Sequence, residues 1–271
     1  MLKRALTGAA LVAVLVIVLL FLPGMCTGML VAFMVAVAAS ELLWTTGIVE
    51  NKRLVIYAQL ASLAVAGWCY MGMPYAWGLV LVLAFTALCF MELLISSGKL
   101  PFQQVAMTMA AGLLVPFLLS ALVRIRIMDN GVFFIATPFV MAFMTDTGAY
   151  LVGCAFGKHK LCPIISPKKT VEGLFGGILG GIVGMVVYGL VLQHAFGFAV
   201  NYLYAVIYGA LGAGGATFGD LMFSVIKRQT GIKDYGKLLP GHGGILDRFD
   251  SVTVVAPLAE VLLMILPLAV K

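Results

Sequence analysis

Charged residues are scarce in this chain of 271 residues. Asp, Glu, Lys and Arg together make up 10% of it, against about 25% in an ordinary soluble domain. Hydrophobic residues make up 63%, and the mean hydropathy is +1.12. Such a composition excludes both a soluble globular domain and a disordered chain. It predicts an all-α fold, namely a polytopic integral membrane protein.

Cysteine is also rare, and no two of the five cysteines form a CxxC pair. We therefore expect small, membrane-embedded side chains rather than disulfides or a metal site. The N-terminus resembles a signal peptide, because Lys3 and Arg4 precede an apolar stretch. No small-residue cleavage site follows that stretch, so we expect it to form the first membrane span.

Apolar runs bounded by charge, Pro or Gly predict about nine transmembrane helices. The expected spans are 5–22, 28–45, 54–71, 75–95, 102–122, 132–153, 174–193, 201–225 and 252–270. With a cytoplasmic N-terminus, 14 of the 17 Lys and Arg residues fall on the cytoplasmic side. Arg124 and Arg126 are the one dissenting pair. The net charge of +6 therefore reports orientation, and we expect no nucleic-acid partner.

Aspartate is absent from residues 1–128, whereas all six aspartates lie between 129 and 250. An acid inside an apolar span is functional by default, because burying it in lipid is costly. We therefore predict two domains: transmembrane scaffold helices in 1–128, and a transmembrane catalytic domain with a cytoplasmic signature loop in 129–271.

Glycine is plentiful and recurs at GxxxG spacings in the span 174–193. Small residues let membrane helices approach closely. We favour packing within the chain as their role, and a homodimer interface is the alternative. The glycines concerned are Gly173, Gly176, Gly177, Gly180, Gly181 and Gly184.

The densest polar segment runs from Ser224 to Asp250, between two apolar spans. Glycines let the main chain approach a phosphate, Lys and Arg neutralise it, and Asp oxygens hold Mg²⁺. Asp247 and Asp250 would share one face of a helix that begins near Ile245. Asp220, on the preceding helix, would lie at a similar depth. The mixture predicts a polyphosphate site, with solvated loop charges as the alternative.

A second polar segment contains Asp146 in an apolar span and then Ser166-Pro-Lys-Lys-Thr-Val-Glu-Gly173. The latter has the form of a helix start, with Pro early and Glu172 near the first turn. A helix N-terminus with two lysines and a threonine is a ready anion site. The alternatives are that Asp146 only packs helices and that the lysines only mark the cytoplasmic side.

These segments resemble the phosphatidate cytidylyltransferase (CDP-diacylglycerol synthase) family, bacterial type. The segment from Ser224 to Asp250 is similar to the family signature in Lys227-Arg228, Lys233-Asp234, Leu239-Pro-Gly-His-Gly-Gly244 and Leu246-Asp-Arg-Phe-Asp250. Thr145–Tyr150 and Ser166–Gly173 resemble two further blocks, so the resemblance covers roughly residues 140–255.

The resemblance implies a nucleotidyltransferase of phospholipid biosynthesis. It would transfer CMP from CTP to phosphatidic acid and release CDP-diacylglycerol and pyrophosphate. The family uses Mg²⁺, and K⁺ is reported as a second cation. The expected partners are CTP, phosphatidic acid and membrane lipids. The expected location is the bacterial cytoplasmic (inner) membrane, with the active site facing the cytoplasm.

The resemblance and the residue chemistry together assign roles as hypotheses. The predicted cation ligands are Asp220, Asp247, Asp250 and, less directly, Asp146. The residues expected to bind phosphates or the leaving pyrophosphate are Lys227, Arg228, Lys233, Arg248, Ser166, Lys168, Lys169 and Thr170. His242 would donate to a phosphate oxygen. The rest of the predicted substrate-binding set is Glu172, Ser224, Asp234, Gly243 and Gly244.

Four other functions remain as alternatives. An ion-coupled transporter would explain the spans and the intramembrane acids, but not the charges packed into one loop. A CTP-dependent transferase on another lipid phosphate, such as an archaeal ether lipid, or a CTP-dependent polyprenol kinase would use similar residues. A purely structural subunit would not need the charge cluster.

Overall fold

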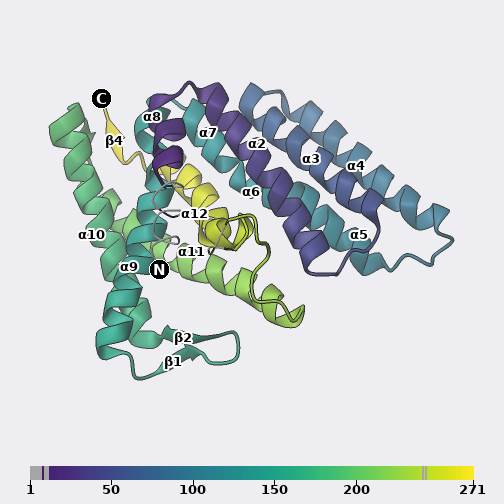
Figure 1. Cartoon of the computed structure of the whole chain (residues 1–271). Coiled ribbons are helices and arrows are strands. Elements are labelled where there is room, and N and C mark those ends of the chain that lie inside the picture. The colour runs from purple at the N-terminus through teal and green to yellow at the C-terminus, as the bar shows by residue number, and fades with distance from the viewer. Residues whose placement is uncertain (1–7, 9–11, 240, 242) are drawn as a thin grey trace. The chain divides into compact units, whose positions relative to one another are not determined.

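The computed structural model describes residues 8, 12–239, 241 and 243–271, and it is almost entirely helical (Figure 1). The named strands of the described part form two antiparallel sheets of two strands each. The predicted all-α class is therefore confirmed. The chain divides into two compact units: unit 1 is Met1–Asp129 with Lys227–Phe249, and unit 2 is Asn130–Ile226 with Asp250–Lys271.

These units follow a different division from the predicted functional one, because Lys227–Phe249 belongs with the N-terminal helices in unit 1. The assignment of scaffold and catalytic roles to 1–128 and 129–271 stays a prediction. The two units are described separately below.

Seven described helices are long and apolar enough to cross a membrane. They are Gly24–Thr45, Lys52–Met71, Tyr75–Ile95, Phe102–Ile127, Gly131–Phe156, Val171–Phe196 and Tyr202–Gln229. The first predicted span, 5–22, lies partly outside the described residues, and Val12–Phe21 is a shorter apolar helix. Helix α12 (Leu246–Ile265) carries four charged residues and is not among the seven. A polytopic membrane protein is confirmed, whereas the count of nine is not.

Unit 1 is a bundle of apolar helices in which α3 packs between α2 and α4 (Figure 1). Asn51 caps α3 by accepting a hydrogen bond from the N–H of Arg53 at 2.9 Å, and Gly72 ends α3 in a left-handed conformation. Its elements are η1 (Ile17–Phe21), α2 (Gly24–Ser40), η2 (Glu41–Thr45), α3 (Lys52–Met71), α4 (Tyr75–Ile95), α5 (Phe102–Met109), η3 (Ala110–Leu114), α6 (Val115–Leu119) and α7 (Ala121–Ile127). The η segments are π-helical.

Arg124 and Arg126, the pair that dissents from the predicted orientation, bind main-chain carbonyls within unit 1. Arg126 donates to the carbonyls of Leu19 at 3.2 Å and Leu22 at 3.1 Å. Arg124 donates to the carbonyl of Phe117 at 3.1 Å, and its guanidinium lies 4.4 Å from the centre of the Phe117 ring. The pair therefore holds helix ends in place, which gives these two charges a structural reason to be there.

Unit 2 is built on α9 and α10, which lie side by side with a β-hairpin at their common end (Figure 1). Helix α12 ends at Ile265, and Ala269–Val270 pairs with Ala199–Val200, so the predicted last span to 270 is too long. The elements are α8 (Gly131–Phe134), α9 (Thr137–Phe156), β1 (Lys160–Cys162), β2 (Ser166–Thr170), α10 (Val171–Phe196), β3 (Ala199–Val200), α11 (Tyr202–Gln229), most of α12, and β4 (Ala269–Val270).

The glycines of α10 are used for close packing inside unit 2. A Cβ on Gly148 of α9 would lie 2.4 Å from the carbonyl oxygen of Gly176. A Cβ on Gly181 would lie 2.7 Å from the carbonyl oxygen of Gly209 in α11. Main-chain atoms at such distances leave no room for a side chain. The predicted packing within the chain is confirmed for these helices.

We expect Gly148→Ala to destabilise the protein by about 1–3 kcal/mol, because the added methyl group would meet main-chain atoms of α10. Gly214→Ala is the matched control, since nothing lies within 4 Å of its Cβ position and Ala favours a helix over Gly. Thermal unfolding of the purified protein in detergent measures both variants. Equal melting temperatures would contradict the close packing of α9 on α10.

Candidate active site

Asp247 is the centre of a buried polar cluster in unit 1, called here the Asp247 cluster: Lys227, Tyr235, Gly244 and Asp247. Its Oδ1 accepts a hydrogen bond from the Nζ of Lys227 at 3.0 Å. Its Oδ2 accepts from the N–H of Tyr235 at 2.7 Å and the N–H of Gly244 at 3.0 Å. Lys227 is 8% exposed and Asp247 7%. A charge so buried requires partners of this kind, since an unpaired ion would be strongly destabilising.

The local fold brings these residues together from two helix ends. Lys227 lies in the last turn of α11, and the N–H of Ile232 donates to the Lys227 carbonyl at 3.0 Å where the helix ends. Asp247 lies in the first turn of α12, which begins at Leu246, so the predicted helix start near Ile245 is confirmed. Gly243 has φ +85°, and a Cβ there would lie 2.8 Å from the Oδ2 of Asp247.

The predicted phosphate-binding residues of the segment Ser224–Asp250, called here the signature segment, differ in what they contact. Lys227 is paired with Asp247, and the Gly244 N–H is used by the same carboxylate. Lys233, Asp234 and Arg248 are exposed on unit 1, as is Arg228 in the last turn of α11. His242 lies outside the described residues.

A second cluster lies wholly within unit 2 and is called here the Asp220 cluster: Asp146, Lys169, Asp220 and Ser224. The Nζ of Lys169 lies 2.6 Å from the Oδ2 of Asp220, and Ser224 donates to Oδ1 at 3.3 Å. Asp146 of α9 lies within electrostatic range of both charges. The side chains of Lys169 and Asp220 are 24% and 29% exposed, so an entering ligand can reach them.

Asp250 belongs to unit 2 and lies where α12 meets α11. A Cβ on Gly219 would lie 2.9 Å from the carbonyl oxygen of Asp250 and 3.1 Å from the Cα of Ser251. Gly219 immediately precedes Asp220, so the two helices touch beside the Asp220 cluster. The Asp250 carboxylate accepts a hydrogen bond from the N–H of Ser251 at 2.7 Å.

The segment predicted as a helix start is instead a strand followed by a helix. Ser166–Thr170 forms β2, and α10 begins at Val171. Thr170 caps α10, because its Oγ1 accepts a hydrogen bond from the N–H of Gly173 at 3.0 Å. The predicted position of Glu172 near the first turn is therefore confirmed, whereas the prediction of Pro167 early in the same helix is wrong, because the helix begins at Val171. Proline is tolerated at the edge of a two-stranded hairpin, where its missing N–H need not enter a ladder.

Glu172, predicted to bind substrate, is occupied by contacts at the base of the hairpin. It accepts hydrogen bonds from the N–H of Lys158 at 3.1 Å and the N–H of His159 at 3.2 Å, and its Oε1 lies 2.6 Å from the Nδ1 of His159. Sequence reasoning missed His159, whose only signal is its place between two lysines. Lys168 is exposed on the same hairpin.

The acidic residues of unit 2 suit Mg²⁺ only together with substrate. Within either unit, the described residues contain no group of three or more His, Cys, Asp or Glu side chains that could hold a metal ion alone. Mg²⁺ is, however, commonly bound by one or two carboxylates together with waters and substrate phosphates. Asp146 and Asp220 provide two such carboxylates near one lysine. The donor set therefore fits this ion.

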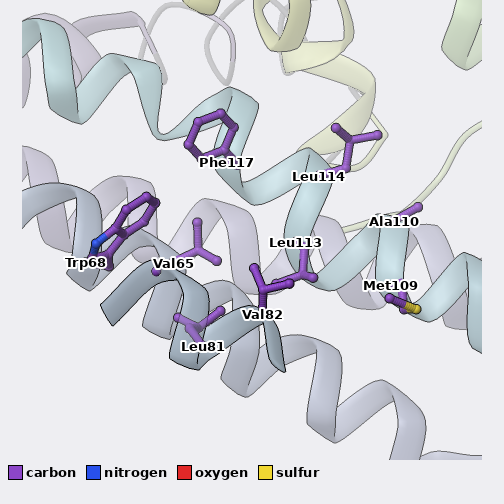
Figure 2. A pocket seen from close by; sticks show the side chains of 10 residues that line it. Val65, Trp68, Leu81, Val82, Met109, Ala110, Leu113, Leu114 and Phe117 are labelled. Atoms are coloured by element: carbon purple, nitrogen blue, oxygen red, sulfur yellow. The ribbon is translucent and has the colours of Figure 1, made fainter. Parts of the chain in front are cut away.

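An apolar pocket of about 400 Å³ lies in unit 1, and its lining residues, between Val65 and Phe117, include none of the residues of the two clusters. It is lined by residues of α3, α4 and the segment Met109–Phe117, and Figure 2 shows side chains of carbon apart from the Trp68 nitrogen and the Met109 sulfur. The rings of Trp68 and Phe117 stack with centroids 6.3 Å apart. With no charged lining residue, this pocket cannot neutralise phosphates.

The described residues form seven helices long and apolar enough to cross a membrane, together with two clusters that each contain a Lys–Asp ion pair, so the protein is a polytopic membrane protein. A family model described as the cytidylyltransferase family matches residues 2–266. The chain belongs to the cytidylyltransferase family.

Relatives named phosphatidate cytidylyltransferase match half of the chain. The protein of Staphylococcus epidermidis is 43% identical over 136 residues, and that of Staphylococcus haemolyticus is 42% identical over 136 residues. The protein of Staphylococcus aureus is 42% identical over 143 residues. Each alignment covers 50% of this chain and 51% of the relative. The chain therefore spans about half the length of the curated relatives it matches.

We expect Lys227→Met to destabilise the protein by about 3–5 kcal/mol, because it leaves the buried Asp247 carboxylate without its counter-charge. The double variant Lys227→Met/Asp247→Asn should recover part of this loss, since it removes both charges. Lys237→Met, at an exposed position, is the control and should change stability by less than about 0.5 kcal/mol. Unfolding in detergent measures all three. If Lys227→Met were as stable as Lys237→Met, the buried ion pair between Lys227 and Asp247 would be refuted.

Proposed function

We propose that this chain is an enzyme, a phosphatidate cytidylyltransferase that transfers CMP from CTP to phosphatidic acid in phospholipid biosynthesis. The observation that carries the proposal is the Asp220 cluster, where two carboxylates, a lysine and a serine hydroxyl gather in a family shown to be cytidylyltransferases. A site for a nucleoside triphosphate requires carboxylates that bind a cation and a lysine that binds a phosphate. The names of the Staphylococcus relatives favour phosphatidic acid as the acceptor.

The reaction is an in-line substitution at the α-phosphorus of CTP. A phosphate oxygen of phosphatidic acid forms the new P–O bond, and the bond from the α-phosphorus to the bridging oxygen of the β-phosphate breaks. The electron pair leaves with pyrophosphate, and CDP-diacylglycerol remains. A phosphate monoester has a second pKa of about 6, so the attacking oxygen is already ionised at neutral pH. Catalysis then requires positioning and charge neutralisation more than a general base.

The described residues supply these two requirements. Within unit 2, Asp146 and Asp220 would hold Mg²⁺, with Asp250 as a further proposed ligand. Within unit 1, Asp247 is a separate proposed cation ligand. When bound, Mg²⁺ would supply charge neutralisation on the phosphates of CTP. Lys169 would exchange its contact with Asp220 for a phosphate oxygen, and Ser224 would keep the Asp220 carboxylate oriented. The remaining proposed phosphate contacts are Ser166, Lys168, Thr170, Lys233, Arg228 and Arg248.

Three further features are part of the proposal. The Lys and Arg distribution supports the bacterial inner membrane with the active site facing the cytoplasm. K⁺ is the proposed second cation. A homodimer is proposed only from the small-residue pattern, and the close contacts of Gly148 and Gly181 inside unit 2 already account for part of that pattern.

The test uses purified protein in detergent with phosphatidic acid, Mg²⁺ and CTP labelled at either the α- or the γ-phosphorus. Label from the α-position should enter the organic phase, and label from the γ-position should stay in water as pyrophosphate. Entry of γ-label, with a polyprenol as acceptor, would instead identify a kinase. A preference for an ether-lipid phosphate in competition would change the acceptor. No lipid label with any acceptor would refute the proposal and favour a transporter.

Asp220→Asn should lower kcat for α-label transfer by roughly 100-fold or more, because it removes a proposed cation ligand and the partner of Lys169. Asp129→Asn is the matched control, since Asp129 is exposed and outside both clusters. Melting temperatures of both variants confirm folding before rates are compared. Equal rates would contradict the role of the Asp220 cluster.

A further inference from the structure

Glu41 is a buried acid in the N-terminal half of the chain. It opens η2, directly after α2, and is the only charged residue from Gly24 to Val49. It is 6% exposed. An acid in an apolar helical segment is costly unless its oxygens are engaged.

Both oxygens of Glu41 are engaged by the signature segment, within unit 1. Oε1 accepts a hydrogen bond from the N–H of Ile245 at 3.0 Å, and Oε2 accepts from the N–H of Leu246 at 2.8 Å. These N–H groups lie at the start of α12, where no carbonyl of the same helix can accept them. A negative charge there also interacts favourably with the helix dipole.

Two glycines of the signature segment lie so close to this carboxylate that a side chain at either position would meet it. A Cβ on Gly236 or on Gly244 would lie 2.4 Å from the Oε1 of Glu41. Neither glycine has a positive φ, so conformation alone does not require glycine there. The close approach of Glu41 does require it.

The Glu41 contact adjoins the Asp247 cluster. Gly244 donates its N–H to Asp247, and the next two N–H groups along the chain donate to Glu41. Main-chain residues 244–246 are thus held by two carboxylates from different parts of the chain. The position of Asp247, one residue further on, follows from where Glu41 holds this turn.

We infer that Glu41 is a positioning residue, which fixes the start of α12 and thereby places Asp247 for its proposed contact with the cation. The catalytic consequence rests on the proposed function, whereas the anchoring itself does not. Glu41 itself does not contact the substrate. It acts through the main chain of Ile245 and Leu246.

The experiment compares the full-length wild type with Glu41→Gln and Glu41→Ala, and with Glu50→Gln as the matched control, because Glu50 is an exposed glutamate nearby in the chain. Hydrogen exchange by mass spectrometry reports the amides of peptides covering 241–249. Loss of a hydrogen bond to a charged acceptor should speed exchange there by about 10- to 100-fold. Gln keeps one acceptor and should have the smaller effect.

The second readout is the Mg²⁺ concentration that gives half of the maximal rate of cytidylyl transfer. Glu41→Gln should raise it by about tenfold at a temperature well below unfolding, whereas partial unfolding alone would lower the rate without moving this midpoint. Glu50→Gln should match wild type in both readouts. If Glu41→Ala does not fold, the hydrogen exchange and the Mg²⁺ midpoint of Glu41→Gln alone decide whether Glu41 is a positioning residue.

The outcomes separate the two proposals. An inactive wild type refutes the proposed function and the catalytic consequence, while the exchange data still decide the anchoring. An active wild type with an unchanged Mg²⁺ midpoint and unchanged exchange in Glu41→Gln overturns the inference. Faster exchange with an unchanged midpoint also overturns it, because Glu41 would then be structural only.

Discussion

Main-chain N–H groups and charges removed from water need partners inside the protein, and the signature segment meets this constraint with two carboxylates. Asp247 binds Lys227 and two N–H groups, and Glu41 binds the first N–H groups of α12. The glycines of the segment allow both carboxylates to approach. Lys227–Phe249 therefore belongs to the same compact unit as the N-terminal helices.

The two clusters differ in how readily a ligand could enter them. In the Asp247 cluster both charged side chains are buried and both carboxylate oxygens accept hydrogen bonds, so a cation would add to a carboxylate whose position is already fixed. The Asp220 cluster is partly exposed, and its lysine forms an ion pair with Asp220. We therefore propose that a cation adds to the fixed Asp247 carboxylate, whereas Lys169 exchanges its contact with Asp220 for a phosphate oxygen.

Periodicity and charge in the sequence predicted most of the spans and the start of α12, since both depend on local composition. The strand Ser166–Thr170 was mistaken for the first turn of α10 because Ser, Pro and Thr are also common at helix starts, and only its pairing with Lys160–Cys162 identifies it as a strand. Glu41 was missed because its partners lie 204 and 205 residues away. No local sequence pattern predicts such a contact, although a lone acidic residue in an apolar run indicates that it has a partner elsewhere in the chain.

The most direct test of the account is to map where CTP binds. Wild-type protein in detergent would be irradiated with a photoreactive CTP analogue and Mg²⁺, with and without excess CTP, and digested for mass spectrometry. If the two clusters bind CTP, label that excess CTP competes away should appear in peptides covering 158–172 or 227–250. Label in the apolar pocket residues 65–117 instead, or label that CTP does not compete, would contradict CTP binding at the two clusters.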